Sequence, residues 1–259
     1  MTVLVGILCA DGVVIASDSA ATFGTGQMPT IGQQTTRKVY KLTDTMIFAA
    51  TGAVGIAQII ADRLSSGWKQ GEFKNTSSPE QMMLKLGTAI SQTVMPFLQS
   101  GVSVQQVAGN ANGSLCKSMV AMDVKGTPCL FQFDYNGAPE RSTEHLPFVS
   151  LGSGQPIADP FLAFLKRLIW SGVQPTVAEG KLVAVWTIDH VCKTNPGGVG
   201  GAVQLMVLPA KGTVLELSDA EGAEHKQQAA AAEQALVRHL RPDTATQEAV
   251  PPLPQPPTA

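Results

Sequence analysis

The N-terminal hairpin constrains the fold of this chain more than any other segment. Residues 3–8 form a continuous apolar run, which is typical of a strand buried on both faces. Ala10-Asp11-Gly12 is a tight-turn signal, and residues 12–18 predict the returning strand. A hairpin of this length brings Asp18 back to the neighbourhood of Thr2, and the first of its two strands is expected to be buried on both faces.

Thr2 has the chemistry of a self-activating nucleophile. It follows Met1, and methionine aminopeptidases remove an initiator methionine readily when a small residue comes next. The exposed threonine would then carry its hydroxyl and a free α-amino group, which can act as the base for that hydroxyl. The pKa of an α-amino group is about 7.7–8.0, far closer to neutrality than that of a lysine. Many proteins begin Met-Thr without using it, so Thr2 becomes a candidate only through its neighbours.

The rest of the chain alternates strand and helix signals in a symmetric order. The expected strands are residues 37–42, 46–50, 117–124, 129–135, 147–152, 202–208 and 213–217, and the expected helices are residues 54–70, 78–98, 154–171, 177–191 and 218–240. Residues 23–36 and 101–113 predict loops. Two apolar sheets, each with one face to cover, and helices outside both predict a mixed α/β (α+β) fold. We expect a four-layer αββα sandwich of two antiparallel sheets.

Composition excludes several classes of protein. The chain has 259 residues and a net charge of −2 without a basic stripe, which argues against nucleic acid as a partner. The four cysteines are scattered without a Cys-x-x-Cys pair, so neither a metal site nor a disulfide framework is predicted, and no cofactor is expected. The N-terminus lacks the features of a signal peptide or membrane span, which predicts a cytoplasmic protein. Residues 1–240 are expected to form one domain, and the Pro-rich residues 241–259 a disordered tail.

Four motifs in order resemble β-type subunits of the proteasome family. They are Thr2 at the start of an apolar strand, DGVVIASDSAAT at residues 11–22, RKVYKL at residues 37–42 and the strand-ending TGAVG at residues 51–55. The likeness resumes at residues 149–154 and in the late Gly-Gly-Val-Gly-Gly run, so it covers roughly residues 2 to 217. Among bacterial relatives, SGQPIADPFL and TNPGGVGG look most like the β-proteobacterial proteasome homologue and less like HslV or Anbu. The resemblance implies an N-terminal nucleophile hydrolase fold.

The resemblance also implies a catalytic set. Thr2 would be the nucleophile of a threonine endopeptidase, with Lys38 favouring its alkoxide and Asp18 holding Lys38 in place and charged. Ser153 would help the Thr2 amine to relay the proton, and the Gly52 N–H would stabilise the tetrahedral intermediate. The residues expected to line the pocket for the side chain before the scissile bond are Ala21, Thr36, Tyr40, Ala50 and Val54.

Each of these residues also has a structural interpretation. Asp18 and Lys38 could form a surface ion pair, Ser153 could be a turn residue, and Gly52 could be a glycine at a helix start. The sequence also departs from the family, because Asn195-Pro196-Gly197-Gly198-Val199 stands where an Asp and a Ser usually precede the late Gly-Gly strand. Asn195 or the backbone of the glycine run would have to substitute for them. Two other functions therefore stay open: a weak or silent ring-forming scaffold, and a non-peptidase amidohydrolase of the same fold.

Assembly is the last implication of the resemblance. Such subunits stack as two face-to-face rings that enclose their N-terminal threonines, and heptameric rings are favoured here over hexameric ones. The expected partners are therefore further copies of the chain, unfolded polypeptide or peptide substrates, and the ATP-dependent unfoldase that is typical of the family. No membrane partner is expected.

Overall fold

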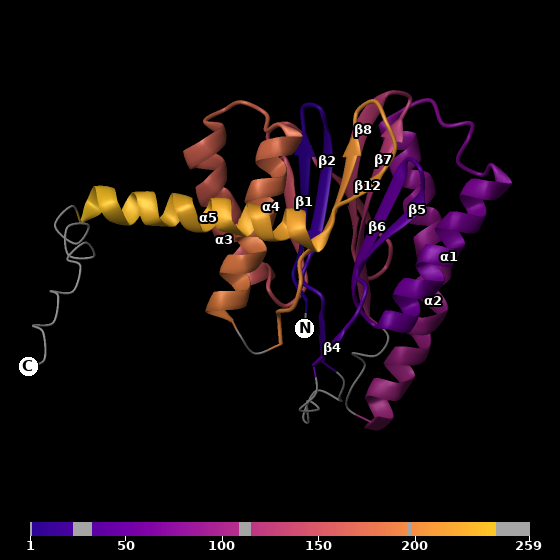
Figure 1. Cartoon of the computed structure of the whole chain (residues 1–259). Helices are drawn as coiled ribbons and strands as arrows, with labels where there is room; N and C mark the ends of the chain where they lie inside the picture. Colours follow the sequence, from indigo (N-terminus) through magenta and orange to yellow (C-terminus); the bar gives the residue numbers. More distant parts are fainter. Residues whose placement is uncertain (1, 23–32, 109–114, 196–197, 242–259) are drawn as a thin grey trace, which may run out of the picture.

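The structure is a computed structural model that describes residues 2–22, 33–108, 115–195 and 198–241. Within these residues, two five-stranded antiparallel sheets stand side by side at the centre of the molecule (Figure 1). The first has the strand order β10-β1-β2-β11-β12, and its members are β1 (Leu4–Cys9), β2 (Gly12–Ser17), β10 (Phe148–Leu151), β11 (Gln204–Pro209) and β12 (Leu215–Glu216). The second has the order β5-β6-β7-β8-β9, and its members are β5 (Val39–Thr43), β6 (Met46–Gly52), β7 (Cys116–Val124), β8 (Thr127–Phe133) and β9 (Pro139–Arg141).

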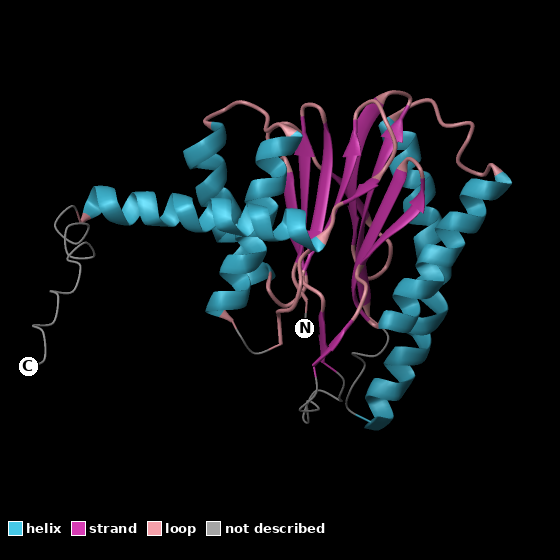
Figure 2. Ribbon diagram, in the orientation of Figure 1, coloured by secondary structure: helices cyan, strands magenta, loops and turns pink. Residues whose placement is uncertain are grey.

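Helices cover the outer face of each sheet (Figure 2). The second sheet packs against α1 (Val54–Gln70) and α2 (Pro79–Ala108). The first packs against α3 (Gln155–Leu165), a π-helical turn (Lys166–Trp170), α4 (Val177–Thr194) and the start of α5 (Asp219–Leu240). The layers are therefore helix, sheet, sheet and helix, and the predicted αββα sandwich is confirmed.

Three apolar clusters hold these layers together, because alternate residues of each strand face opposite sides of a sheet. On β1, Val5 and Ile7 face α3 and α4, whereas Leu4 and Leu8 face the second sheet. The inter-sheet cluster also takes Ile47 of β6 and Leu130 of β8. β1 is thus buried on both faces, as its unbroken apolar sequence predicted. β2 alternates in the same way, with Val14 and Ala16 facing the helices and Val13 and Ile15 facing the second sheet.

Two helices differ from their predicted extents. α2 continues to Ala108 although residues 101–113 were predicted to be a loop. A glycine such as Gly101 costs a helix interior about 1 kcal/mol, but a helix that is already nucleated gains one hydrogen bond for each added residue. Residues 154–171 were expected to form one α-helix, but the last turn of that segment is π-helical, with the Ser171 N–H donating to the Lys166 carbonyl at 3.3 Å.

The predicted loop at residues 23–36 and the predicted strand at residues 213–217 differ in part from the structure. Gln33–Thr35, assigned to a loop by the sequence, form β4 and pair with β3 (Ala20–Thr22) as a separate two-stranded sheet. β12 is limited to Leu215–Glu216, shorter than the expected strand. The remainder of the predicted loop, residues 23–32, and all but the first residue of the predicted tail lie outside the described part of the chain. In the part that is described, each helix is too short or too polar to cross a membrane.

Candidate active site

Three strand ends meet at one end of the two sheets, and each carries a predicted site residue. Thr2 precedes β1, Asp18 follows β2, and Lys38 precedes β5. Antiparallel pairing places Leu4 opposite Ser17, so the chain entering β1 lies beside the chain leaving β2. There the Val3 N–H donates to Asp18 Oδ1 at 3.0 Å. Thr2 and Asp18 are therefore brought together by the hairpin register.

Asp18 is completely buried and is held by main-chain donors. Its carboxylate accepts hydrogen bonds from the N–H groups of Val3 (3.0 Å), Ala20 (3.3 Å) and Gly200 (3.2 Å). Its Oδ1 also accepts from Lys38 Nζ at 2.8 Å. These donors compensate for the hydration that a buried carboxylate loses.

Lys38 reaches Asp18 from the other sheet, so the ion pair bridges the two sheets. The Lys38 residue is only 6% exposed. Loss of hydration lowers the pKa of its ammonium, and the Asp18 charge opposes that effect by raising it. The net direction is downward. The pair is buried between the sheets, so it is not the surface ion pair that the sequence left open.

The chain around Ser153 holds the backbone of Thr2. The Thr2 N–H donates to Ser153 Oγ at 3.1 Å, and the Gly154 N–H donates to the Thr2 carbonyl at 3.1 Å. Gly152 has a positive φ of 101°, and a Cβ there would lie 2.2 Å from the Thr2 carbonyl oxygen. Glycine is therefore required at this position, and Ser153 lies within hydrogen-bonding distance of the nitrogen that would become the free amine.

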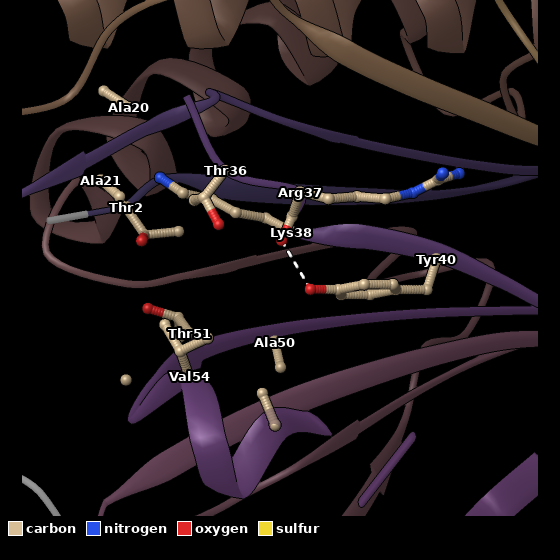
Figure 3. A pocket seen from close by; sticks show the side chains of 12 residues that line it. Thr2, Ala20, Ala21, Thr36, Arg37, Lys38, Tyr40, Ala50, Thr51 and Val54 are labelled. Atoms are coloured by element: carbon tan, nitrogen blue, oxygen red, sulfur yellow. Dashed lines mark hydrogen bonds between the residues drawn. The ribbon is translucent and has the colours of Figure 1, made fainter. Parts of the chain in front are cut away.

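A cavity opens beside Thr2 and gathers the predicted substrate-binding residues (Figure 3). Its lining residues are Thr2, Ala20, Ala21, Thr36, Arg37, Lys38, Tyr40, Ala50, Thr51, Gly52, Val54 and Ala57. All five side chains expected to form the pocket are among them, together with Thr2, Lys38 and Gly52. The Lys38 side chain extends toward Thr2, whereas the Arg37 side chain runs away from it. Asp18 and Ser153 bond to Lys38 and Thr2 but are not among the residues that line the cavity.

Gly52 ends β6 at the edge of this cavity. Its φ is 109°, and a Cβ there would lie 2.2 Å from the Leu115 carbonyl oxygen. The next N–H, that of Ala53, donates to the same carbonyl at 2.8 Å. The strand therefore turns into α1 through a backbone conformation that favours glycine.

Tyr40 closes one side of the cavity. Its hydroxyl donates to the Arg37 carbonyl at 2.6 Å, the interaction dashed in Figure 3. The Tyr40 hydroxyl therefore has a hydrogen-bond partner within the protein, and the residue adds an aromatic ring to the lining of the cavity.

The late glycine run contacts Asp18 through its backbone. The Gly200 N–H donates to Asp18, and its carbonyl accepts from the N–H groups of Ser19 (3.1 Å) and Ala20 (2.9 Å). Asn195 ends α4, where its N–H donates to the Val191 carbonyl at 2.8 Å. Of the two substitutes suggested by the sequence, the backbone is the one that contacts Asp18. Residues 196–197 lie outside the described part of the chain.

The sequence interpretation missed Gln204, Thr51 and Arg37. Thr51 and Arg37 line the cavity, and Gln204 bonds to the backbone on both sides of Arg37. Gln204 had a detectable signal, because it takes an inward position of β11 in alternation with Met206 and Leu208, where an apolar residue is expected.

Comparison with known proteins identifies the family. A family model described as "Proteasome subunit" matches residues 2–167, which is well over half of the chain. The chain belongs to the proteasome subunit family. A proteasome subunit beta of Archaeoglobus profundus is 28% identical over 61% of this chain and 63% of its own length, so just under two thirds of that relative is matched. A proteasome subunit beta of Methanohalophilus mahii is 26% identical over 82% of this chain and 88% of its own length.

Solved structures support the same fold. Anbu (ancestral beta-subunit) from Yersinia bercovieri has a TM-score of 0.67 and 17% identity, and it covers 96% of this chain and 99% of its own. The Anbu complex from Pseudomonas aeruginosa, solved as a helical assembly, has a TM-score of 0.62 and 22% identity over 99% and 98% of the two chains. These likenesses establish the N-terminal nucleophile hydrolase fold. The closer resemblance to the β-proteobacterial homologue stays a prediction of the sequence.

Proposed function

We propose that this family member is a threonine endopeptidase whose nucleophile is Thr2 Oγ1 after removal of Met1. The observation that carries the proposal is the buried Lys38–Asp18 ion pair, whose lysine lines the same cavity as Thr2. A buried ion pair has a high desolvation cost, so its place beside a candidate nucleophile favours a chemical role over a structural one.

The proposed reaction is acyl transfer followed by hydrolysis. Thr2 Oγ1 attacks the peptide carbonyl carbon while its proton passes to the Thr2 amine, and the Lys38 charge stabilises the developing alkoxide. The oxyanion is stabilised by the Gly52 N–H, a donor type whose removal costs about 10²–10³ in rate. The C–N bond then breaks, and the leaving amine takes the proton with the help of Ser153 Oγ. Water attacks the resulting ester, which returns Thr2 to its starting state.

Substrate selectivity follows from the cavity. Ala21, Thr36, Tyr40, Ala50 and Val54 bring no charge, and Ala50 leaves room where a larger residue would block. The two cations on the lining are already paired, Lys38 with Asp18 and Arg37 with Glu216. A charged substrate side chain would therefore lose its hydration without gaining a partner, whereas each buried methylene contributes about 0.8 kcal/mol.

We expect cleavage after Leu, Phe or Tyr and little cleavage after Arg, Lys, Asp or Glu. A panel of fluorogenic peptides that differ only in the residue before the scissile bond measures this, with the Thr2→Ala protein as the blank. Fastest cleavage after Glu would show that Arg37 or Lys38 binds the substrate side chain, and fastest cleavage after Arg would reveal an acidic group at the cavity.

Assembly belongs to the same proposal. The substrates would be unfolded polypeptides or peptides, cut in a chamber formed by copies of the chain in the cytoplasm, and an ATP-dependent unfoldase would supply them. Stacked heptameric rings stay the prediction, and the helical assembly named for the Pseudomonas aeruginosa protein is the alternative geometry. Electron microscopy of the purified protein distinguishes closed rings from an open helix.

The decisive experiment combines mass and turnover. Intact mass should show loss of Met1 and, after treatment with a β-lactone or epoxyketone, one covalent adduct that Thr2→Ala abolishes. Peptide hydrolysis should disappear in the same variant while its assembly persists. Retention of Met1 without an adduct would favour a ring-forming scaffold. An adduct on Thr2 together with amide but no peptide turnover would favour a non-peptidase amidohydrolase.

A further inference from the structure

Gln204 occupies a polar position inside an otherwise apolar layer. It begins β11 and stands opposite Ser17, the residue before Asp18. Along β11, Leu205 and Val207 pack toward the helices, whereas Met206 and Leu208 pack between the sheets. Gln204 lies on the same face of β11 as Met206 and Leu208. Its carboxamide therefore projects between the two sheets, at the end where the candidate site lies.

The carboxamide bonds to the backbone of the segment that carries Lys38. Its Oε1 accepts from the N–H groups of Lys38 (2.8 Å) and Val39 (3.2 Å). Its Nε2 donates to the Thr36 carbonyl at 2.6 Å. One side chain of the first sheet thus fixes both ends of the segment from Thr36 to Val39, which enters the second sheet.

This contact has a geometric consequence for the ion pair. Asp18 belongs to the first sheet, and Lys38 must cross the inter-sheet gap to lie 2.8 Å from it. The Lys38 carbonyl is bonded to the second sheet, where it accepts from the Ala50 N–H at 3.3 Å. Gln204 ties the same residue's N–H to the first sheet. The distance between the Lys38 backbone and Asp18 is therefore fixed by one hydrogen bond to each sheet.

We infer that Gln204 is a positioning residue that places Lys38 against Asp18 and Thr2. The inference rests on the proposed peptidase function for its catalytic consequence, but not for the geometry. Met206 and Leu208 help to join the two sheets by apolar packing. Gln204 joins the sheets as well, and in addition it positions Lys38. A misplacement of about 1 Å in a catalytic group can cost on the order of 10²-fold in rate, which sets the size of the effect to be sought.

The test variant is Gln204→Met, which keeps an unbranched side chain of similar length and removes all three hydrogen bonds. We expect kcat for an apolar fluorogenic peptide to fall on the order of 10²-fold, with a smaller change in KM. Gln204→Glu retains the acceptor for Lys38 and Val39, loses the donor to Thr36 and adds a negative charge beside that carbonyl, so it should keep part of the kcat that Gln204→Met loses. The matched control is Glu216→Gln, which breaks only the exposed ion pair from Arg37 in the same segment and should leave kcat near wild type.

A second measurement does not depend on peptidase activity. Acetylation of Lys38 by acetic anhydride, scored by peptide mass spectrometry with Lys41 as the internal reference, reports how well Lys38 is shielded. Lys38 should react several-fold faster relative to Lys41 in Gln204→Met than in the wild type or Glu216→Gln. Gln204→Leu, which also removes all three hydrogen bonds, takes the place of Gln204→Met if that variant fails to assemble.

The outcomes separate the two proposals. A wild-type kcat together with wild-type Lys38 labelling in the Gln204 variants would overturn the positioning role. A lower melting temperature with kcat and labelling unchanged would overturn it as well, because Gln204 would then only join the sheets. If the wild-type protein hydrolyses no peptide, the proposed function fails, and the labelling ratio still decides whether Gln204 places Lys38.

Discussion

The charges of Asp18 and Lys38 are stabilised by different numbers of described hydrogen-bond partners. The Asp18 carboxylate accepts three main-chain hydrogen bonds in addition to the one from Lys38. The Lys38 ammonium is buried with Asp18 as its ion-pair partner. Removing Lys38 therefore leaves a carboxylate with donors around it. Removing Asp18 takes the ion-pair partner from a buried cation and the acceptor from the N–H groups of Val3 and Gly200, whereas the Ala20 N–H keeps the Gly200 carbonyl at 2.9 Å.

The two alanine variants should consequently differ in stability. We expect Asp18→Ala to cost about 3–5 kcal/mol and Lys38→Ala about 1–3 kcal/mol. For a protein of this size, each kcal/mol lowers the melting temperature by roughly 2–4 °C. Calorimetry at equal protein concentration measures both, and Asp44→Ala, which breaks an exposed ion pair with Lys41, is the control that should change little. A larger loss in Lys38→Ala than in Asp18→Ala would contradict this account.

The lowered pKa of Lys38 predicts the alkaline limit of activity. Catalysis as proposed requires the charged ammonium, so activity is present below the pKa of Lys38 and is lost as pH rises through it. Because burial lowers that pKa, the loss should begin below the ordinary value of about 10.4. The pH dependence of kcat measures the limit, with Lys41→Met as the control that should leave it unmoved. An alkaline limit at or above the ordinary lysine value would show that the Asp18 charge outweighs the loss of hydration.

At the scale of elements, the sequence predicts what depends on local periodicity and misses what depends on distant contacts. β1 follows from an unbroken apolar run, β2 and β11 follow from largely apolar segments, and the position of Asp18 follows from the length of one hairpin. By contrast, the Gly200 N–H reaches Asp18 across 182 positions of the chain, and Gln204 reaches Lys38 across 166. Such bonds depend on how two sheets are placed against each other, which no local pattern encodes. The π-helical turn is missed for another reason, because its apolar spacing is close to that of an α-helix.

The junction between β10 and α3 gives a prediction at this scale. In Gly152→Ala, the new Cβ would meet the Thr2 carbonyl oxygen at 2.2 Å, so the backbone of Thr2 or of residue 152 must shift. Gly126→Ala is the matched control, because Gly126 also has a positive φ of 82° but a Cβ there meets no atom within 4 Å. Both variants carry the backbone strain of about 1 kcal/mol, and only the first displaces the nucleophile.

We therefore expect the rate of β-lactone acylation of Thr2 to fall on the order of 10²-fold in Gly152→Ala and to stay near wild type in Gly126→Ala. Intact mass followed over time measures both rates. Equal acylation in the two variants would mean that the backbone of residue 152 moves away while Thr2 keeps its place.

At the scale of the whole molecule, the outer helical layers leave apolar side chains in solvent. Phe164 at the end of α3 and Leu168 on the π-helical turn are 41% and 52% exposed, and they are four residues apart. Side chains at this spacing lie on the same side of a helix, so we treat Phe164 and Leu168 as one patch, with the Arg167 guanidinium 5.9 Å from the centroid of the Phe164 ring. The underlying segment is anchored by the buried residues Leu162, Leu165 and Trp170, so the patch loses little freedom when it is covered. Apolar side chains grouped on a rigid element favour a subunit contact, whereas a single exposed apolar residue is ordinary.

The last prediction is that this patch contributes to assembly. Replacing Phe164 and Leu168 together by Glu places two charges where apolar surface would be covered, and an unpaired charge is costly to desolvate. We expect the double variant to run as a smaller species in size-exclusion chromatography with light scattering, while Thr2→Ala keeps the wild-type mass. Leu84→Glu is the control, because Leu84 is 59% exposed but lies on α2, away from the Phe164–Leu168 patch. A full-sized assembly of the double variant would place the subunit contacts elsewhere, and dissociation by Leu84→Glu alone would place them on α2.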